Sequence, residues 1–525
     1  MRRRDVLRSA VAGAATLAMP RVVSARANKL LRFRPNNDLT VLDPVFSSVF
    51  VVRYHAHLVF DTLYGQDNDF NPHPQMVEGH VVEDGGRLWR LKLRDGLKFH
   101  DGEPVLARDA VASIRRWAKV DAFGQALMAA TDELTAPSDK EIVFRLKRPF
   151  PLLPAALGKS STFVPVIMPE RLALSDVSKP VTDAIGSGPY RYIAKDRVVG
   201  QVTVYEKFAD YVPRPEGRPE YASGPKVPYI DRIEWRVIPD QATAAAALRT
   251  GEIDWFEEPI ADLLPTLRKD PKITIELISV LGNMGIIRFN HLRAPFDNPA
   301  IRRVTAKAIS QNEMMQAVGA KKWSDDVGFF TPDSPMASKI GLPIAARAPD
   351  FSSIRRELAS AGYEGEKVVL LDAPQSQNIH VQAVVLEDQL KRAGMNVELA
   401  SLDFGNWLQR RNNREARDNG GWNLLTTFLP GQELWDPTAH LALRGNKLGA
   451  WSGWPDSPKL EELRDTWLSA ATEDDRKDIC RQMQLQALHG MPYVPSGRWV
   501  TPTAYRKGLT GVSRYIPIFY NVQMT

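Results

Sequence analysis

Cysteine is nearly absent from this sequence, because Cys480 is the only one among 525 residues. A single thiol excludes an internal disulfide and any zinc site built from several cysteines. Long apolar runs are missing as well: the run from Ala10 to Met19 is shorter than the ~18–20 residues that span a bilayer. The sequence therefore predicts no membrane-spanning helix.

The chain also has little net charge outside its N-terminus. The chain has a formal net charge of +6, but residues 1–27 hold six arginines against one acid, Asp5. Without residues 1–27 the formal net charge is +1. A nucleic-acid partner is therefore not expected.

Motifs of common enzymes are missing too. The chain has no His-Glu-x-x-His, no P-loop and no nucleophile elbow. The glycine-rich run 186–189 lacks the third glycine of a dinucleotide site and precedes a strand pattern instead of a helix. We expect no cofactor, no resident metal and no enzymatic activity; a secreted hydrolase built on an α/β lobe is kept as a remote alternative.

The N-terminus reads as an export signal. Arg3 and Arg4 precede the apolar run, and Ala25-Arg26-Ala27 follows it as a small-residue cleavage site. The paired arginines resemble the twin-arginine type of signal. We expect residues 1–27 to be removed and the mature protein to lie in the periplasm.

Helix and strand patterns alternate through the rest of the chain, which indicates α/β lobes. Helices are expected at 49–63, 105–117, 241–250, 298–318, 379–393, 458–471 and 473–489. Strands are expected at 30–33, 87–93, 142–146, 190–193, 202–205, 253–256, 273–277, 284–289, 367–371, 396–400, 422–428 and 493–500.

Five motifs then occur in one order along the chain: 89–102 (Trp-Arg-Leu-Lys-Leu-Arg-Asp-Gly-Leu-Lys-Phe-His-Asp-Gly), 186–190 (Gly-Ser-Gly-Pro-Tyr), 251–254 (Gly-Glu-Ile-Asp), 295–298 (Pro-Phe-Asp-Asn) with Ile301-Arg302-Arg303, and 390–395 (Leu-Lys-Arg-Ala-Gly-Met). Together they resemble extracytoplasmic solute-binding protein family 5, the binding proteins of peptide, opine and nickel ABC importers. Most of these residues are turns and helix ends that identify the fold and are not expected to touch the solute.

The resemblance implies a two-lobed periplasmic-binding-protein fold of class II, the large peptide-binding type, with an extra subdomain on the first lobe. Mapped onto this chain, the first lobe is expected at 28–60, 184–271 and 491–525, the subdomain at 61–183 and the second lobe at 272–490. It also implies a monomer that closes over a peptide or peptide-like solute and presents it to an inner-membrane ABC permease with its ATPases.

The resemblance places the solute between the lobes. Peptide-binding relatives hold the peptide ammonium with an Asp ahead of a Gly-x-x-Asp-Pro loop, and Glu433 lies at that position here, although a solvated loop acid is the equal alternative. The other expected contacts are Phe46, Ser47 and Ser48 of the first lobe and Gly431, Gln432, Trp435 and Trp422 of the second. Trp422 is alternatively a core residue of the second lobe.

One departure concerns the carboxylate end of a peptide. Dipeptide-binding relatives use an arginine in a loop whose counterpart here is Ala373-Pro374-Gln375-Ser376-Gln377, which contains no basic residue. Gln375 is expected to hydrogen-bond a neutral or hydroxylated solute, and Arg498 is the candidate replacement for the missing arginine. The alternatives are an opine, a sugar, or a metal chelate or metallophore, with His440 as a candidate metal ligand.

Overall fold

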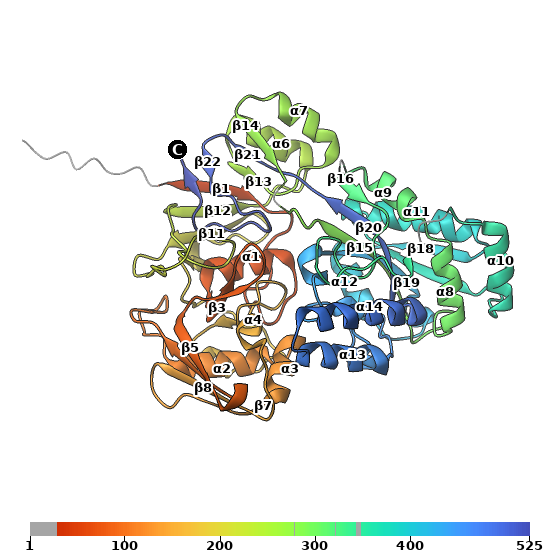
Figure 1. The fold of residues 1–525 in the computed structure, drawn as a ribbon. Coiled ribbons are helices and arrows are strands. Elements are labelled where there is room, and N and C mark those ends of the chain that lie inside the picture. Colours follow the sequence, from red (N-terminus) through yellow and green to blue (C-terminus); the bar gives the residue numbers. More distant parts are fainter. Residues whose placement is uncertain (1–28, 278, 321, 343–347) are drawn as a thin grey trace, which may run out of the picture.

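Two β-sheets of different composition organise the chain. The computed structural model describes residues 29–525 apart from 278, 321 and 343–347, so the predicted signal at 1–27 lies outside the described residues. The first sheet has the strand order β10-β11-β12-β1-β13-β21-β14 and the second the order β16-β20-β15-β19-β17-β18. In Figure 1 the first sheet lies at the upper left and the second at the right.

The first sheet is mixed. Its central strand β1 is parallel to β12 and β13, and the remaining neighbours are antiparallel. Its strands are β1 (Leu30–Arg34), β10 (Tyr190–Tyr192), β11 (Val202–Lys207), β12 (Arg232–Arg236), β13 (Trp255–Phe256), β14 (Ile273–Glu276) and β21 (Thr503–Arg506). Its helices are α1 (Phe50–Val59), α6 (Gln241–Thr250) and α7 (Leu264–Lys269). The helix α6 has its predicted bounds, because Asp240 caps its start and Gly251 ends it with a φ of 86°.

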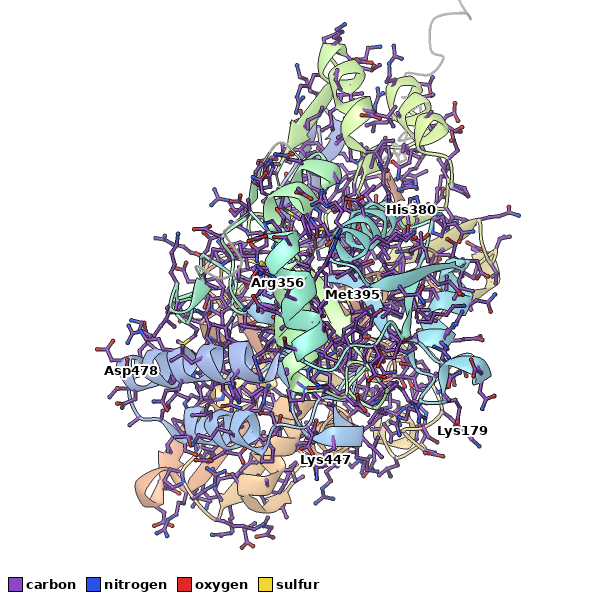
Figure 2. The ribbon with its side chains drawn as sticks, turned by 90° about the vertical axis from the view of Figure 1, so that its right-hand side faces the viewer. Lys179, Arg356, His380, Met395, Lys447 and Asp478 are labelled. Atoms are coloured by element: carbon purple, nitrogen blue, oxygen red, sulfur yellow. The ribbon has the colours of Figure 1, made fainter. Side chains whose placement is uncertain are left out.

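The second sheet is also mixed, with β15 antiparallel to β19 and β20 and β17 parallel to β18 and β19. Its strands are β15 (Asn283–Phe289), β16 (Lys322–Ser324), β17 (Lys367–Asp372), β18 (Asn396–Ser401), β19 (Leu424–Pro430) and β20 (Tyr493–Val500). The helices of this half are α8 (Pro299–Lys307), α9 (Gln311–Val318), α10 (Phe351–Ser360), α11 (Gln377–Arg392), α12 (Phe404–Arg411), α13 (Pro458–Ser469) and α14 (Glu473–Gly490). Figure 2 views this lobe from outside, with Arg356 on α10 and Asp478 at the exposed side of α14.

A separate four-stranded antiparallel sheet, in the order β5-β6-β8-β7, lies at the lower left of Figure 1. Its strands β5 (Val77–Glu83), β6 (Leu88–Leu93), β7 (Thr131–Thr135) and β8 (Glu141–Leu146) all fall within the predicted subdomain, as do α2 (Ala107–Trp117), α3 (Ala122–Ala130), α4 (Leu153–Leu157) and α5 (Glu170–Ala173). Short strand pairs complete the fold: β2 (Asp61–Thr62) with β9 (Val166–Ile167), β3 (Tyr64–Gln66) with β4 (Pro72–Pro74), and β22 (Leu509–Thr510) with β23 (Gln523–Met524).

Two predicted boundaries are wrong. β14 hydrogen-bonds with β21 in the first sheet, so the second lobe begins after β14 and not at 272. β20 pairs with β15 and β16 in the second sheet, so the chain returns to the first lobe after Val500 and not at 491. An apolar pattern identifies a strand but does not say which of two sheets it joins.

The predicted helix 298–318 is two helices. The side chain of Ser310 accepts a hydrogen bond from the backbone N of Glu313, which caps the start of α9 after α8 has ended at Lys307. The predicted helix 49–63 is shorter than expected, because the chain leaves α1 at Val59 and enters β2. No helix in the described part of the chain combines the length and the apolar character needed to cross a bilayer.

Candidate functional site

The loop that follows β19 is held against a segment that connects the two sheets. Gly431 N donates to the carbonyl oxygen of Gly282 at 2.7 Å. A Cβ atom on Gly431 would lie 2.7 Å from the carbonyl oxygen of Leu281, so this close approach requires glycine. The loop continues as the short 3-10 helix η6 (Gly431–Leu434), whose Gln432 and Glu433 side chains bind residues of the first half of the molecule.

Glu433 is the most enclosed acid of this loop, with 2% of its surface exposed. Its Oε1 accepts hydrogen bonds from Nη2 of Arg53, on α1 of the first lobe, and from Oγ1 of Thr162 in the subdomain range. The Arg53 Nη2 also donates to Thr162 Oγ1 at 3.1 Å. Both lobes and the subdomain therefore meet at one carboxylate, which here is the partner of an arginine.

The two loop residues beside Glu433 make further contacts across the same interface. Gln432 Nε2 donates to Ser160 Oγ at 2.7 Å, and Gln432 Oε1 accepts from the Tyr221 hydroxyl at 3.0 Å. Burial raises the pKa of Tyr221, so its hydroxyl stays a neutral donor. The Trp435 ring packs edge-on to Phe70 with 5.0 Å between centroids.

The predicted first-lobe contacts Phe46, Ser47 and Ser48 lie in the loop that precedes α1. Phe46 is 41% exposed, and Ser47 Oγ accepts a hydrogen bond from the backbone N of Val49 at 3.4 Å. Ser48 is also exposed. The residues that face the second lobe come from α1 instead: Phe50 stacks on Phe428 of β19 at 6.3 Å, and the Arg53 guanidinium lies 5.4 Å from the Phe50 ring centroid.

A signal for Arg53 was present in the sequence. It is a lone arginine in the first turns of a helix that is otherwise apolar or aromatic through Tyr54, and an arginine on a buried helix needs an anionic partner. The pattern does not say which acid, far along the chain, supplies the negative charge.

Two other predicted site residues lie away from this interface. Trp422 is a core residue of the second lobe: its Nε1 donates to the carbonyl oxygen of Arg411 at 3.0 Å and its ring packs on Trp454. Gln375 is exposed, and its side chain accepts from the backbone N of Phe404.

Arg498 binds the segment that connects the sheets. Its Nε donates to the carbonyl oxygen of Leu281 at 2.7 Å, and its Nη2 donates to the carbonyl oxygen of Val280 and to Asp333 Oδ2, both at 2.6 Å. All of these partners belong to the protein itself, so Arg498 stabilises the path of the chain between the lobes.

His440 is enclosed in the second lobe. Its Nε2 lies 2.7 Å from the carbonyl oxygen of Phe329, and burial lowers the pKa of His440 to about 3, so the ring is neutral. Residues 29–525, outside the gaps at 278, 321 and 343–347, contain no group of three His, Cys, Asp or Glu side chains placed to hold a metal ion. His440 therefore has no described co-ligands.

Comparison with known families identifies the family of this chain. The profile of the bacterial extracellular solute-binding proteins, family 5 (middle), matches residues 71–438. This chain belongs to that family. The resemblance read from the five motifs is confirmed.

Relatives within the family match most or nearly all of the chain. The probable peptide ABC transporter periplasmic-binding protein y4tO of Sinorhizobium fredii is 34% identical over 530 residues, covering 99% of each chain. The glutathione-binding protein GsiB of Pectobacterium atrosepticum is 25% identical over 428 residues, covering 80% of this chain and 77% of GsiB.

Solved structures confirm the two-lobed fold. The binding protein AgaA of Agrobacterium, solved with agropinic acid, matches with a TM-score of 0.78 at 20% identity and covers 94% of this chain and 99% of AgaA. The dipeptide-binding protein of Pseudoalteromonas sp. SM9913, solved with Met-Leu, matches with a TM-score of 0.77 at 18% identity and covers 95% and 100%.

Proposed function

We propose that this protein captures a peptide or peptide-like solute between its two lobes in the periplasm and delivers it to an inner-membrane ABC permease. The observation that carries the proposal is the meeting of α1, the subdomain and the loop 430–437 at Glu433. Such contacts form when two lobes close, and closure around a solute is the way in which hinged binding proteins work. The name of the relative from Sinorhizobium fredii supports peptide as the class of solute.

Hinge motion between the lobes takes place in the segments that connect the two sheets. Only two described connections join the sheets, one from β14 to β15 and one from β20 to β21. Thr501 in the second connection donates to Glu258 of the first lobe, while Arg498 fixes the first connection. Short connections between two sheets that each keep their own pairing are suited to hinge closure.

The solute class is tested by thermal unfolding of the protein from Asn28 onward. A panel of free di- to tetrapeptides, agropinic acid, sugars and a nickel–histidine chelate is compared at equal concentration. A solute that binds only the folded state stabilises it by about 2.7 kcal/mol at 100 times its Kd, which raises Tm. We expect free peptides to give the largest shift and to lower the radius of gyration in small-angle scattering. A shift with the chelate or the sugars alone would contradict peptide capture.

Export and assembly complete the proposal. Residues 1–27 act as a twin-arginine signal, and the mature chain is a monomer. Replacing Arg3 and Arg4 with lysine should leave the precursor unprocessed in the cytoplasm, as checked by fractionation and immunoblotting. Normal processing of this double variant would contradict the twin-arginine route, and a dimer in light scattering would contradict the monomer.

A further inference from the structure

Arg53 is buried with part of its guanidinium unused. Its side chain is 3% exposed, and its Nη2 alone makes the bonds to Glu433 and Thr162. In the described part of the chain, Nε and Nη1 of Arg53 are buried and have no hydrogen-bond acceptor. Buried donors of a charged group without acceptors are costly, so such a site is suited to an anionic partner with two oxygens.

The surroundings of Arg53 come from both lobes. Phe50 lies under the guanidinium and stacks on Phe428 of the second lobe. Among the described residues, Glu433 is the single acid that forms an ion pair with Arg53. Arg53 thus lies at the interface itself, not inside one lobe, and its environment changes whenever the lobes separate.

We propose that Arg53 binds the anionic group of the solute, a carboxylate, while Glu433 holds its cationic group. This inference rests on the proposed function. In the structure the two side chains neutralise each other; a zwitterionic solute between them replaces each partner with one of its own charges. A planar guanidinium can bind both oxygens of a carboxylate through two parallel hydrogen bonds.

This arrangement selects solutes that carry both charges. A solute with an ammonium but no carboxylate would part Arg53 from Glu433 and leave a buried arginine without a counter-charge, which is strongly unfavourable. A solute with a carboxylate alone would leave Glu433 in the same position. Neutral solutes therefore compete poorly with the ion pair already formed.

The test compares Met-Leu, and each free peptide that raises Tm in the screen, with its C-terminal amide and its N-acetyl form by titration calorimetry. We expect the unaltered protein to prefer the free acid over the amide by about 10- to 150-fold. In Arg53→Gln this preference should fall to near 1, whereas Glu433→Gln should keep it and lose the preference for the free ammonium. Arg53→Lys should show an intermediate preference because lysine is a point charge without the planar fork.

Controls separate binding from folding. Arg116→Lys alters another buried arginine that pairs with a carboxylate, Asp43, away from the interface, and should leave both preferences unchanged. If Arg53→Gln does not fold, Arg53→Lys and the double variant Arg53→Gln/Glu433→Gln carry the test. Peptide binding with the same acid-to-amide preference in the unaltered and Arg53 variants would overturn this inference and leave the proposed function standing. Failure of every peptide to bind the unaltered protein would overturn both.

Discussion

Two buried arginine–carboxylate pairs differ in where their residues lie: one pair lies on one side of the interface between the lobes, and the other crosses it. In the first, Arg116 of α2 pairs with Asp43 at 2.7 Å, with 1% and 0% of their side chains exposed. Asp43 also accepts from the backbone N of Val45 and of Val181, and Arg116 Nη1 donates to the carbonyl oxygen of Ser175. All of these residues lie in the first lobe and its subdomain, so the pair is satisfied whatever the second lobe does.

The second pair, Arg53 with Glu433, joins the two lobes. Its additional partner is the side chain of Thr162, and two nitrogens of Arg53 lack an acceptor among the described residues, against one nitrogen of Arg116. The difference indicates two purposes: a pair completed by backbone groups of one body stabilises the fold, and an incompletely bonded pair across a hinge is available for exchange.

The largest expected effect breaks the first pair. Asp43→Asn removes the charge opposite Arg116 and should lower the free energy of unfolding by about 3–5 kcal/mol, the usual cost of leaving one buried charge unpaired. Glu433→Gln should lower it by less than about 1 kcal/mol, because the lobes can part and water can solvate Arg53. Urea unfolding followed by circular dichroism measures both. Equal losses in the two variants would show that the interlobe pair is as structural as the first.

A third buried carboxylate, Glu257, sharpens the contrast because no Lys or Arg in the described chain forms an ion pair with it. It accepts from the Tyr54 hydroxyl at 2.6 Å and from the backbone N of Asn36 at 2.7 Å. Burial, helped by the neighbouring charge of Glu258, raises the pKa of Glu257 to about 7.

Because the pKa of Glu257 is raised in the folded protein, the folded state becomes less stable as the pH rises. The folded protein keeps a proton on Glu257 that the unfolded chain releases above the ordinary pKa of 4.5. Its contribution to stability is therefore complete below pH 4.5 and is lost as the pH rises through 7, by up to about 3 kcal/mol. Glu257→Gln should flatten the unfolding free energy between pH 5 and pH 8 relative to the unaltered protein. An unchanged pH profile in this variant would mean that Glu257 is ionised throughout.

Much of the fold was predictable because local signals agree with it. The helix α6 and the strand β20 have their predicted bounds, the first through its N-cap Asp240 and its left-handed Gly251. The split between α8 and α9 was missed because apolar periodicity continues across it, although Ser310 followed by Glu313 is itself a capping pattern. Which sheet β20 joins depends on its pairing with strands far away in the sequence, and no local pattern encodes that pairing.

The site was predictable on one side only. An offset from a short loop motif placed Gly431, Gln432, Glu433 and Trp435. The structure brings the last three to contacts with the first lobe and its subdomain, while Gly431 packs on the segment that connects the sheets. Arg53 on its apolar helix indicates that an anionic partner is needed, but that partner is 380 positions away in the chain, so the sequence does not identify it. Motif spacing locates a loop, but pairing across a hinge needs the three-dimensional structure.

The smallest expected effect extends the contrast from ion pairs to single hydroxyl groups. Tyr221 donates to Gln432 across the lobes at 3.0 Å, and Tyr211 donates to Asp61 at the same distance on the first-lobe side. Tyr221→Phe keeps the ring and its packing on Phe70 but loses the hydrogen bond to Gln432 across the lobes. The net value of such a bond, about 0.5–1.5 kcal/mol, should raise the Kd for a peptide by about 2- to 13-fold and leave the unfolding free energy nearly unchanged.

Tyr211→Phe is the matched control, because it should lower the free energy of unfolding and leave the Kd as it was. Calorimetric titration and urea unfolding of the two variants give the four values needed. If Tyr221→Phe lowers stability while sparing affinity, the contact between Tyr221 and Gln432 belongs to the permanent fold. If it weakens affinity alone, the loop 430–437 engages the first lobe as part of closing on the solute.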